Sequence, residues 1–249
     1  MDIIVCVKRV PDTETRIQIA EDKTRIDPSG VKFIVSPYDE FAVEAALRTV
    51  EEAEDGEVTV VSLGDDDAQE TLRAALAMGA DKGLLLQGEG STDGLATAKA
   101  LAAELEDSEA PLILLGVKAA DDDQSQVGPM LGVLLDRATV TGVTAFRVEG
   151  DTVVCDREIE GGVEVVEVDL PAVLTVTKGT YEPRYASLKG IMAAKRKPLE
   201  TKEAEAVEGR IRVQQLTYPP ERGDGQIVGE GADAVPELVR LLREEANAL

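Results

Sequence analysis

The sequence predicts an α/β fold: a parallel sheet with helices on both faces, followed by antiparallel hairpins and a C-terminal arm that carries a terminal helix. Apolar strand-like runs alternate with amphipathic helical segments as far as about residue 135, an order typical of parallel sheets with right-handed crossovers. Short β-rich pieces separated by Gly-Asp and Gly-Gly turns follow, as expected for hairpins. From Pro198 the chain is polar and rich in Glu, Gly and Pro until a terminal amphipathic segment.

Four short apolar runs in the first half are typical of buried parallel strands. These strands are expected at Ile3–Val7, Glu57–Ser62, Gly83–Gln87 and Leu112–Leu115. Ser36 as N-cap and Pro37 as the first helical residue begin the first helix, whose inward stripe is Phe41, Ala42, Ala45, Ala46 and Val50. The other helices are expected at Ala68–Met78 (closed by Gly79), at Leu95–Leu105 and after Pro129. The polar residues 8–28 are expected to form a loop or an excursion of edge strands.

The second half begins with three antiparallel pieces, expected at residues 139–148, 152–158 and 163–168. A further strand at Pro171–Thr177 and a helix at Leu188–Ala194 follow, and the terminal helix is expected at Ala234–Ala248. The globular α/β domain is therefore expected to span residues 1–199. Residues 200–249 form the arm, which is expected to clasp another subunit; the alternative is that it folds back on its own domain.

Composition excludes several classes of function. The chain has 249 residues and no histidine, so it lacks the commonest general base and metal ligand. Cys6 and Cys155, the only cysteines, lie in strand-like runs, where small buried side chains are expected and a zinc site is not. No apolar run approaches the roughly 20 residues of a membrane span, and the N-terminus has no signal-peptide pattern, so we expect a cytoplasmic protein without membrane insertion.

The charge is strongly acidic overall and locally basic. With 26 basic and 49 acidic residues the net charge is −23, which disfavours binding to nucleic acid. Because the acidic residues are scattered, we interpret them as a solvated surface of the kind found in proteins adapted to high salt. Between Lys178 and Lys202 there are instead seven basic and two acidic residues, a local charge of +5. A docking surface for an acidic partner explains this reversal better than a solubilising face does.

The stretch Leu112–Leu135 has the form of a nucleotide-phosphate site: a short strand, a polar loop from Gly116 and then a helix. Loop N–H groups and a helix N-terminus offer donors to an anion. An ordinary strand-to-helix turn capped by Asp and Ser fits the spacing equally well. The glycines between Gly88 and Gly94 are better explained as a flexible turn than as a second phosphate loop.

Several motifs in order resemble one family, the small (beta) subunit of electron-transfer flavoproteins. The segment VCDREIEGGVEVVEVDLPAVLTV, residues 154–176, is similar to the family's signature, and it continues into Glu182-Pro-Arg-Tyr185 and Ser187-Leu188. Upstream, residues 7–10 (VKRV), 75–81 (ALAMGAD) and 114–126 (LLGVKAADDDQSQ) also match. The resemblance covers essentially the whole chain.

The resemblance implies a heterodimer with an alpha subunit that holds most of the redox FAD. The beta subunit of this family has a Rossmann-like, adenine-nucleotide-binding α/β fold and contributes no catalytic residue of its own. Its nucleotide is AMP, or a second FAD in a bifurcating type that oxidises NADH. The positions that match the family's nucleotide contacts are Cys6, Ser36, Pro37, Tyr38, Asp39, Leu63, Gly116, Val117, Lys118, Ala119, Ala120, Asp121, Asp122, Asp123, Gln124, Ser125, Gln126 and Val127. Backbone amides, rather than formal charge, are expected to hold the phosphate, while the aspartates shape the loop.

The resemblance also implies partners. The flavoprotein would carry electrons from flavin dehydrogenases of the acyl-CoA type, in fatty acid oxidation, to a quinone-linked oxidoreductase. Leu188 matches the family's anchor residue for dehydrogenases. The expected recognition surface comprises Arg184, Leu188, Lys189, Ile191, Met192, Lys195 and Arg196. A third hypothesis, a stand-alone nucleotide-binding regulator, accounts for the sheet and the loop but not for the hairpins, the basic segment or the arm.

Overall fold

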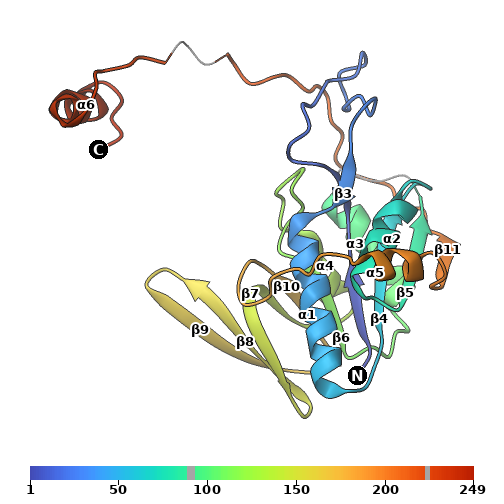
Figure 1. The fold of residues 1–249 in the computed structure, drawn as a ribbon. Coiled ribbons are helices and arrows are strands. Elements are labelled where there is room, and N and C mark those ends of the chain that lie inside the picture. The colour runs from blue at the N-terminus through green and yellow to red at the C-terminus, as the bar shows by residue number, and fades with distance from the viewer. Residues whose placement is uncertain (89–92, 222–224) are drawn as a thin grey trace. The chain divides into compact units, whose positions relative to one another are not determined.

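The computed structural model describes residues 1–88, 93–221 and 225–249 (Figure 1). The chain divides into two compact units, Met1–Gln215 and Leu216–Leu249. Within the described part of the first unit, nine strands form one sheet in the order β11-β5-β4-β1-β6-β10-β7-β8-β9. Neighbours from β11 to β7 are parallel, whereas β7, β8 and β9 are antiparallel. The predicted α/β fold is confirmed.

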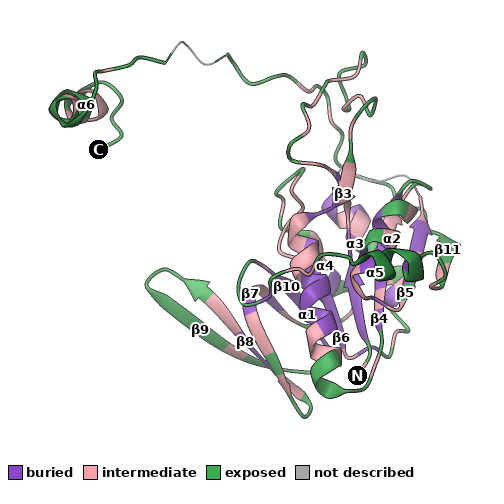
Figure 2. Cartoon of the chain, in the orientation of Figure 1, coloured by how far each residue is buried: buried purple, intermediate pink, exposed green. Residues whose placement is uncertain are grey.

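The centre of the sheet is mostly apolar because helices cover both of its faces. Its strands are β1 (Ile3–Cys6), β4 (Val58–Gly64), β5 (Lys82–Gln87), β6 (Leu112–Gly116) and β10 (Ala172–Val176). Every residue of β1 and β10 is buried, and Figure 2 shows the same continuous burial through the middle of the sheet. The hairpin strands are β7 (Ala138–Glu149), β8 (Thr152–Ile159) and β9 (Gly162–Asp169). They extend the sheet beyond the helices, as Figure 1 shows.

The helices lie on both faces of the sheet, as predicted. One core cluster contains buried residues of α1 (Pro37–Ala53), α2 (Ala68–Met78) and α5 (Leu188–Ala194). The other contains those of α3 (Gly94–Leu105) and α4 (Val127–Leu134). Helix α4 begins at Val127, ahead of Pro129, and not after that proline as expected. The first turn of a helix tolerates proline because its N–H groups have no intrahelical partner.

The expected arm is not extended from Pro198 onwards. Residues Leu199–Glu203 form β11, a parallel edge strand beside β5. Most side chains of this strand are exposed, so its sequence, LETKE, needs no apolar pattern. Charged side chains are typical of an edge strand. Only Leu199 packs against the core. The sequence therefore carries little signal for this strand.

Two smaller pieces complete the structure. Within the excursion between β1 and α1, β2 (Arg9–Pro11) and β3 (Phe33–Val35) form a separate antiparallel pair. The second unit contains a 3-10 turn, η1 (Ala232–Ala234), and helix α6 (Val235–Glu244), which lies within the expected terminal helix. No helix in the described ranges is long and apolar enough to cross a bilayer.

Candidate functional site

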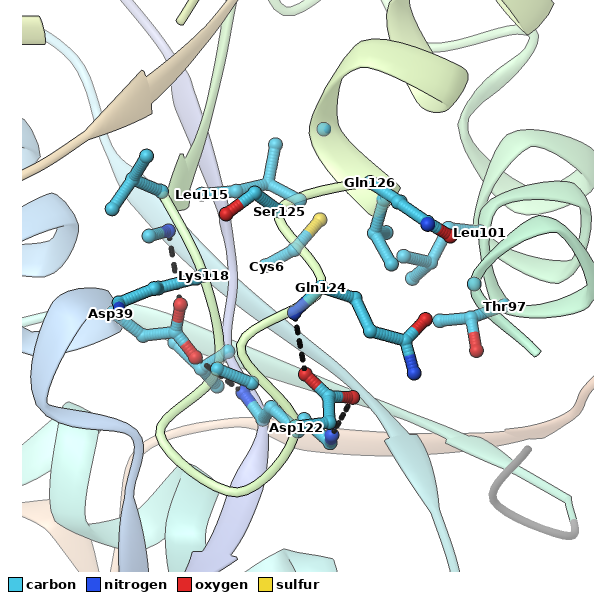
Figure 3. A pocket seen from close by; sticks show the side chains of 18 of the residues that line it. Cys6, Asp39, Thr97, Leu101, Leu115, Lys118, Asp122, Gln124, Ser125 and Gln126 are labelled. Carbon is cyan, nitrogen blue, oxygen red and sulfur yellow. Dashed lines mark hydrogen bonds and ion pairs between the residues drawn. The ribbon is translucent and has the colours of Figure 1, made fainter. Parts of the chain in front are cut away.

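The carboxyl ends of β1 and β6 define the candidate site. The chain leaves β1 towards β4 and β5 on one side and returns to β6 on the other, so the sheet reverses its order of growth between β1 and β6. In doubly wound sheets, ligands bind in the crevice at such a switch point. A pocket with a cavity volume of about 130 Å³ opens there, and Figure 3 shows side chains reaching it from separate elements.

Most of the residues predicted to contact a nucleotide line this pocket. They are Cys6, Asp39, Leu63, Gly116, Val117, Lys118, Ala119, Asp122, Gln124, Ser125, Gln126 and Val127. The pocket lining does not include Ser36, Pro37, Tyr38, Ala120, Asp121 or Asp123. Ser36 occupies the expected N-cap position, but its side chain makes no capping hydrogen bond.

Several other lining residues were not predicted from the sequence, namely Val7, Lys8, Val61, Gly94, Thr97, Leu101, Leu115 and Gly128. Thr97 and Leu101 belong to α3, which packs against α4. No local pattern marks them, because only that tertiary packing brings them to the pocket. Lys8 directly follows the residues 3–7 expected as the first strand, so its position at the carboxyl end of that strand was the available signal.

Asp39 ties three elements together at the pocket. Its Oδ2 accepts a hydrogen bond from the Lys8 backbone N–H at 2.7 Å, after β1, and its Oδ1 accepts one from the Gly116 N–H at 2.9 Å, at the end of β6. The residue lies in the first turn of α1 and is 6% exposed. Burial raises the pKa of Asp39 to about 7, although the two backbone donors act to lower it. Both oxygens therefore have donors from the chain itself.

The three aspartates of the loop are paired with lysines. Lys8 Nζ lies 2.8 Å from an oxygen of Asp121 and 2.9 Å from one of Asp122, and Lys118 Nζ lies 2.8 Å from Asp123. Burial acts to lower the pKa of Lys8, but the two aspartates outweigh it and raise that pKa, so the ammonium stays charged. These pairs offset the negative charge that would otherwise repel a phosphate.

Loop geometry and the start of α4 supply the donors for an anion. Asp122 Oδ1 accepts from the Gln124 N–H at 3.3 Å, so this aspartate shapes the loop as predicted. Ser125 has a φ of 53°, which turns the chain into α4. The first N–H groups of a helix lack intrahelical partners and favour anions. At Gly128 a side chain would collide with Thr175, so glycine lets α4 sit directly against β10.

The pocket offers binding chemistry rather than an acid–base or nucleophilic pair. Burial raises the pKa of the Cys6 thiol to about 12, which keeps it protonated. Among the residues that the structure describes, no group of three or more His, Cys, Asp or Glu side chains is placed to hold a metal ion. The arrangement can hold an anionic ligand whose apolar part meets Leu63, Leu101 and Leu115.

The predicted recognition surface lies elsewhere, on α5 and the residues around it. Leu188 is 85% exposed and Met192 62%, and Ile191 is also exposed. Lys189, Lys195 and Arg196 are exposed as well. Arg184 is not free in this structure, because its guanidinium lies 2.7 Å from Glu44 and also contacts Glu51. Lys197 Nζ donates to the carbonyls of Leu76, Gly79 and Ala80 at the end of α2.

The fold and the pocket define a doubly wound α/β protein with a crevice at the switch point of its sheet. The family model described as "Electron transfer flavoprotein domain" matches residues 24–207, and the chain belongs to the electron transfer flavoprotein family. The predicted resemblance to the beta subunits of this family is confirmed by relatives with that name.

Those relatives match over nearly their full length. The "Electron transfer flavoprotein subunit beta" of Bradyrhizobium diazoefficiens is 40% identical over 100% of both chains. That of Syntrophomonas wolfei is 40% identical over 90% of this chain and 88% of its own, and that of Bos taurus 38% identical over 96% and 97%. The subunit name implies pairing with an alpha subunit.

Proposed function

We propose that this chain, paired with an alpha subunit that holds the redox FAD, carries electrons from acyl-CoA-type flavin dehydrogenases to a quinone-linked oxidoreductase in the cytoplasm. The pocket between β1 and β6 carries the proposal, since it gathers most of the nucleotide-matching residues in a chain that belongs to this family. Its role is electron carriage with no catalytic residue of its own. Of residues 200–249, the part that follows β11 clasps the alpha subunit.

The pocket binds AMP in this proposal. The α4 N-terminus and Ser125 hold the phosphate, and the leucines at the wall contact the adenine. Asp122 supports a monophosphate over a flavin diphosphate, because Lys8 holds its side chain at the pocket wall, where it occupies space that a second phosphate would need. AMP is then a structural ligand.

A second candidate is the bifurcating type, in which this pocket binds a second FAD that oxidises NADH. The sequence Gln126-Val127-Gly128-Pro129, which resembles that type, forms the start of α4 at the pocket. This observation favours FAD, while Asp122 favours AMP.

Counting the nucleotides in the purified heterodimer tests these proposals. The chain is co-expressed with its alpha subunit, and FAD and AMP are extracted and quantified. One FAD and one AMP per heterodimer support the first proposal, and two FAD support the bifurcating type. A stable monomer that takes up no flavin partner would instead favour a nucleotide-binding regulator and overturn both.

The recognition surface has its own test. Replacing Leu188 with alanine removes the most exposed apolar side chain of α5. We expect slower electron transfer from an acyl-CoA dehydrogenase with unchanged FAD content, because a small apolar knob acts as a hot spot in a transient contact. Unchanged transfer kinetics would defeat the assignment.

A further inference from the structure

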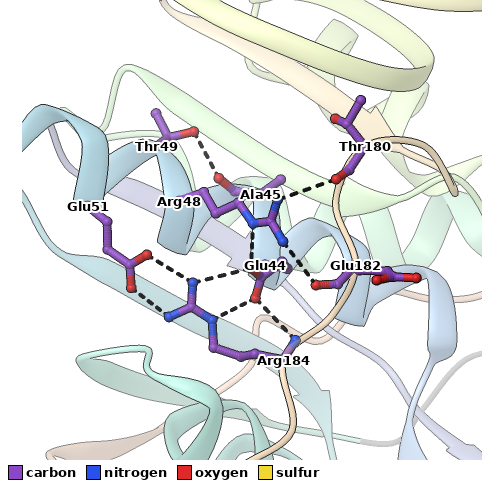
Figure 4. Close-up of polar contacts among 8 residues, drawn as sticks. All are labelled: Glu44, Ala45, Arg48, Thr49, Glu51, Thr180, Glu182 and Arg184. Atoms are coloured by element: carbon purple, nitrogen blue, oxygen red, sulfur yellow. Dashed lines mark hydrogen bonds and ion pairs between the residues drawn. The ribbon is translucent and has the colours of Figure 1, made fainter.

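The buried carboxylate of Glu44 connects α1 to residues 180–184, which precede α5, the helix of the recognition surface (Figure 4). Glu44 is only 2% exposed. Its Oε2 lies 2.7 Å from Arg184 Nε, and its Oε1 lies 2.6 Å from Arg48 Nε. Burial acts to raise the pKa of Glu44, but the two arginines outweigh it and lower that pKa. The carboxylate is therefore charged and saturated by two cations.

The same network holds the backbone of residues 180–184, which form no helix or strand. Arg48 donates to the carbonyls of Thr180 and Glu182, each at 3.4 Å, and the Arg184 backbone N–H donates to Glu44 at 3.3 Å. Figure 4 shows both arginines converging on Glu44 from opposite sides. The Thr180 N–H also donates to the Thr144 carbonyl at 3.0 Å, and the buried Tyr181 hydroxyl bonds to the Phe146 backbone. Beyond these two residues, the contacts of Glu44, Arg48 and Arg184 hold the backbone at residues 182–184.

The recognition segment, residues 180–197, is fixed to α2 at its C-terminal end. Arg73 donates to the carbonyls of Ala194 and Lys197 at 2.6 and 2.8 Å. At Gly190 a side chain would lie 2.5 Å from the Ala77 carbonyl oxygen, so glycine allows α5 to approach the α2 backbone. Between the two anchored ends, Tyr185 is 100% and Leu188 85% exposed. The large side chains of Tyr185 and Leu188 are therefore exposed to solvent on a segment that is fixed at both ends.

We propose that Glu44 is a positioning residue, which holds residues 180–192 in the conformation that presents Leu188 to a flavin dehydrogenase. The inference rests on the proposed function. Glu44 is buried and cannot touch the partner, so it acts through Arg48 and Arg184. A surface already ordered before contact avoids the entropy of ordering a loop during binding, and the complex forms more readily.

Glu51 provides a contrast within the same network. It contacts the Arg184 guanidinium as Glu44 does, but its side chain is 57% exposed, and an exposed pair is worth little. Glu44 also accepts a hydrogen bond from the backbone of the segment, at the Arg184 N–H. Two glutamates that bind the same arginine should therefore differ in how strongly their substitution affects the segment.

The experiment compares Glu44→Gln with Glu51→Gln in the FAD-loaded heterodimer. Glutamine keeps the volume of Glu44 but places an amide NH₂ against one of the two arginine donors. We expect backbone amides within residues 180–192 to exchange hydrogen about tenfold faster in Glu44→Gln, and within about twofold of wild type in Glu51→Gln. Glu44→Asp, which keeps the charge at a shorter reach, serves as the conservative variant and should fall between them.

Kinetics supply the second readout, with an acyl-CoA dehydrogenase from the same organism as electron donor. We expect Glu44→Gln to raise the KM for the flavoprotein about tenfold with kcat within about twofold, because positioning affects the encounter and not the flavin. Unchanged exchange and KM in Glu44→Gln, or equal changes in Glu51→Gln, would overturn the inference.

The Leu188→Ala variant separates this inference from the proposed recognition role of Leu188. If Leu188→Ala leaves KM unaltered, the recognition role fails. If Leu188→Ala raises KM but Glu44→Gln does not, the positioning role of Glu44 fails.

Discussion

Asp39 and Gly116 meet where α1 begins and β6 ends: the Gly116 N–H donates to Asp39 Oδ1 across 2.9 Å. The approach is so close that a Cβ at position 116 would lie 2.5 Å from that oxygen and 2.6 Å from the Tyr38 carbonyl carbon. Since the other Asp39 oxygen accepts from the Lys8 backbone, one carboxylate fixes the spacing of the pocket's walls. The hydrogen bond that spaces these walls therefore needs both the Asp39 carboxylate and a residue without a side chain at position 116.

Replacing Gly116 with alanine tests that requirement. The added methyl group must displace Asp39 and the backbone at Tyr38, which breaks the buried hydrogen bond, so we expect a loss of about 2–4 kcal/mol in stability and a loss of bound nucleotide. Thermal unfolding of the heterodimer and nucleotide extraction measure the two effects. Gly162→Ala is the matched control, because nothing lies within 4 Å of a Cβ there. Equal melting temperatures for the two variants would contradict the requirement.

The pKa of Asp39 predicts a pH dependence of stability. Its value is about 7 in the folded chain against an ordinary 3.8. Between these values the folded chain binds more protons than the unfolded chain, so the contribution of this group is fully present below about pH 4 and is lost as pH rises through 7.

Comparison with Asp39→Asn isolates this titration. Asparagine lacks the ionisable group, so the unfolding free energy of the wild type relative to the variant should fall between pH 4 and pH 8, by up to about 4 kcal/mol. Urea unfolding of both heterodimers at several pH values measures this difference. A difference that stays constant, or that grows with pH, would show that the backbone donors keep the pKa of Asp39 low.

Much of the fold could be predicted from the sequence because its periodic signals are local. Runs such as Ile3–Cys6 and the Ser36-Pro37 helix start are visible in the sequence, and the shared edge of parallel strands then brings Cys6, Asp39 and Gly116 together. The features that could not be predicted depend on tertiary contacts. β11 is a polar edge strand, and Thr97 reaches the pocket only through the packing of α3 on α4.

The basic segment, Lys178–Lys202, also shows what depends on tertiary structure. Its composition indicates a positive surface but does not show which of its cations remain available to a partner. Arg184 is engaged by two glutamates, Lys197 by carbonyls and Lys202 by Glu104 at 2.6 Å. Composition counts charges, whereas partner binding depends on which of them remain exposed.

Lys197 and Lys195 should therefore respond differently to mutation. Lys197 Nζ donates to three carbonyls at the C-terminal end of α2, at 2.6–3.1 Å, where a cation also offsets the helix dipole. We expect Lys197→Met to lower stability by about 1–3 kcal/mol, because it leaves partly buried carbonyls without their donor. Lys195→Met, at an exposed position, should leave the melting temperature unchanged and slow association with an acidic dehydrogenase at low salt. The reverse pattern, with Lys195→Met destabilising and Lys197→Met affecting only association, would refute this division.

The net charge of −23 predicts that the protein needs salt. Scattered carboxylates repel one another, and the screening length shortens from about 10 Å at 0.1 M salt to about 3 Å at 1 M. Exposed pairs such as Arg25–Asp22 weaken over the same range, but single exposed pairs contribute little. We therefore expect the melting temperature of the heterodimer to rise by about 5 °C or more between 0.1 and 1 M KCl, with reversible loss of folding in dilute buffer. Sucrose at matched osmolality controls for solvent exclusion, since it screens no charge. Equal stability at both salt concentrations, or an equal rise in sucrose, would remove the adaptation to high salt as an explanation of the acidic surface.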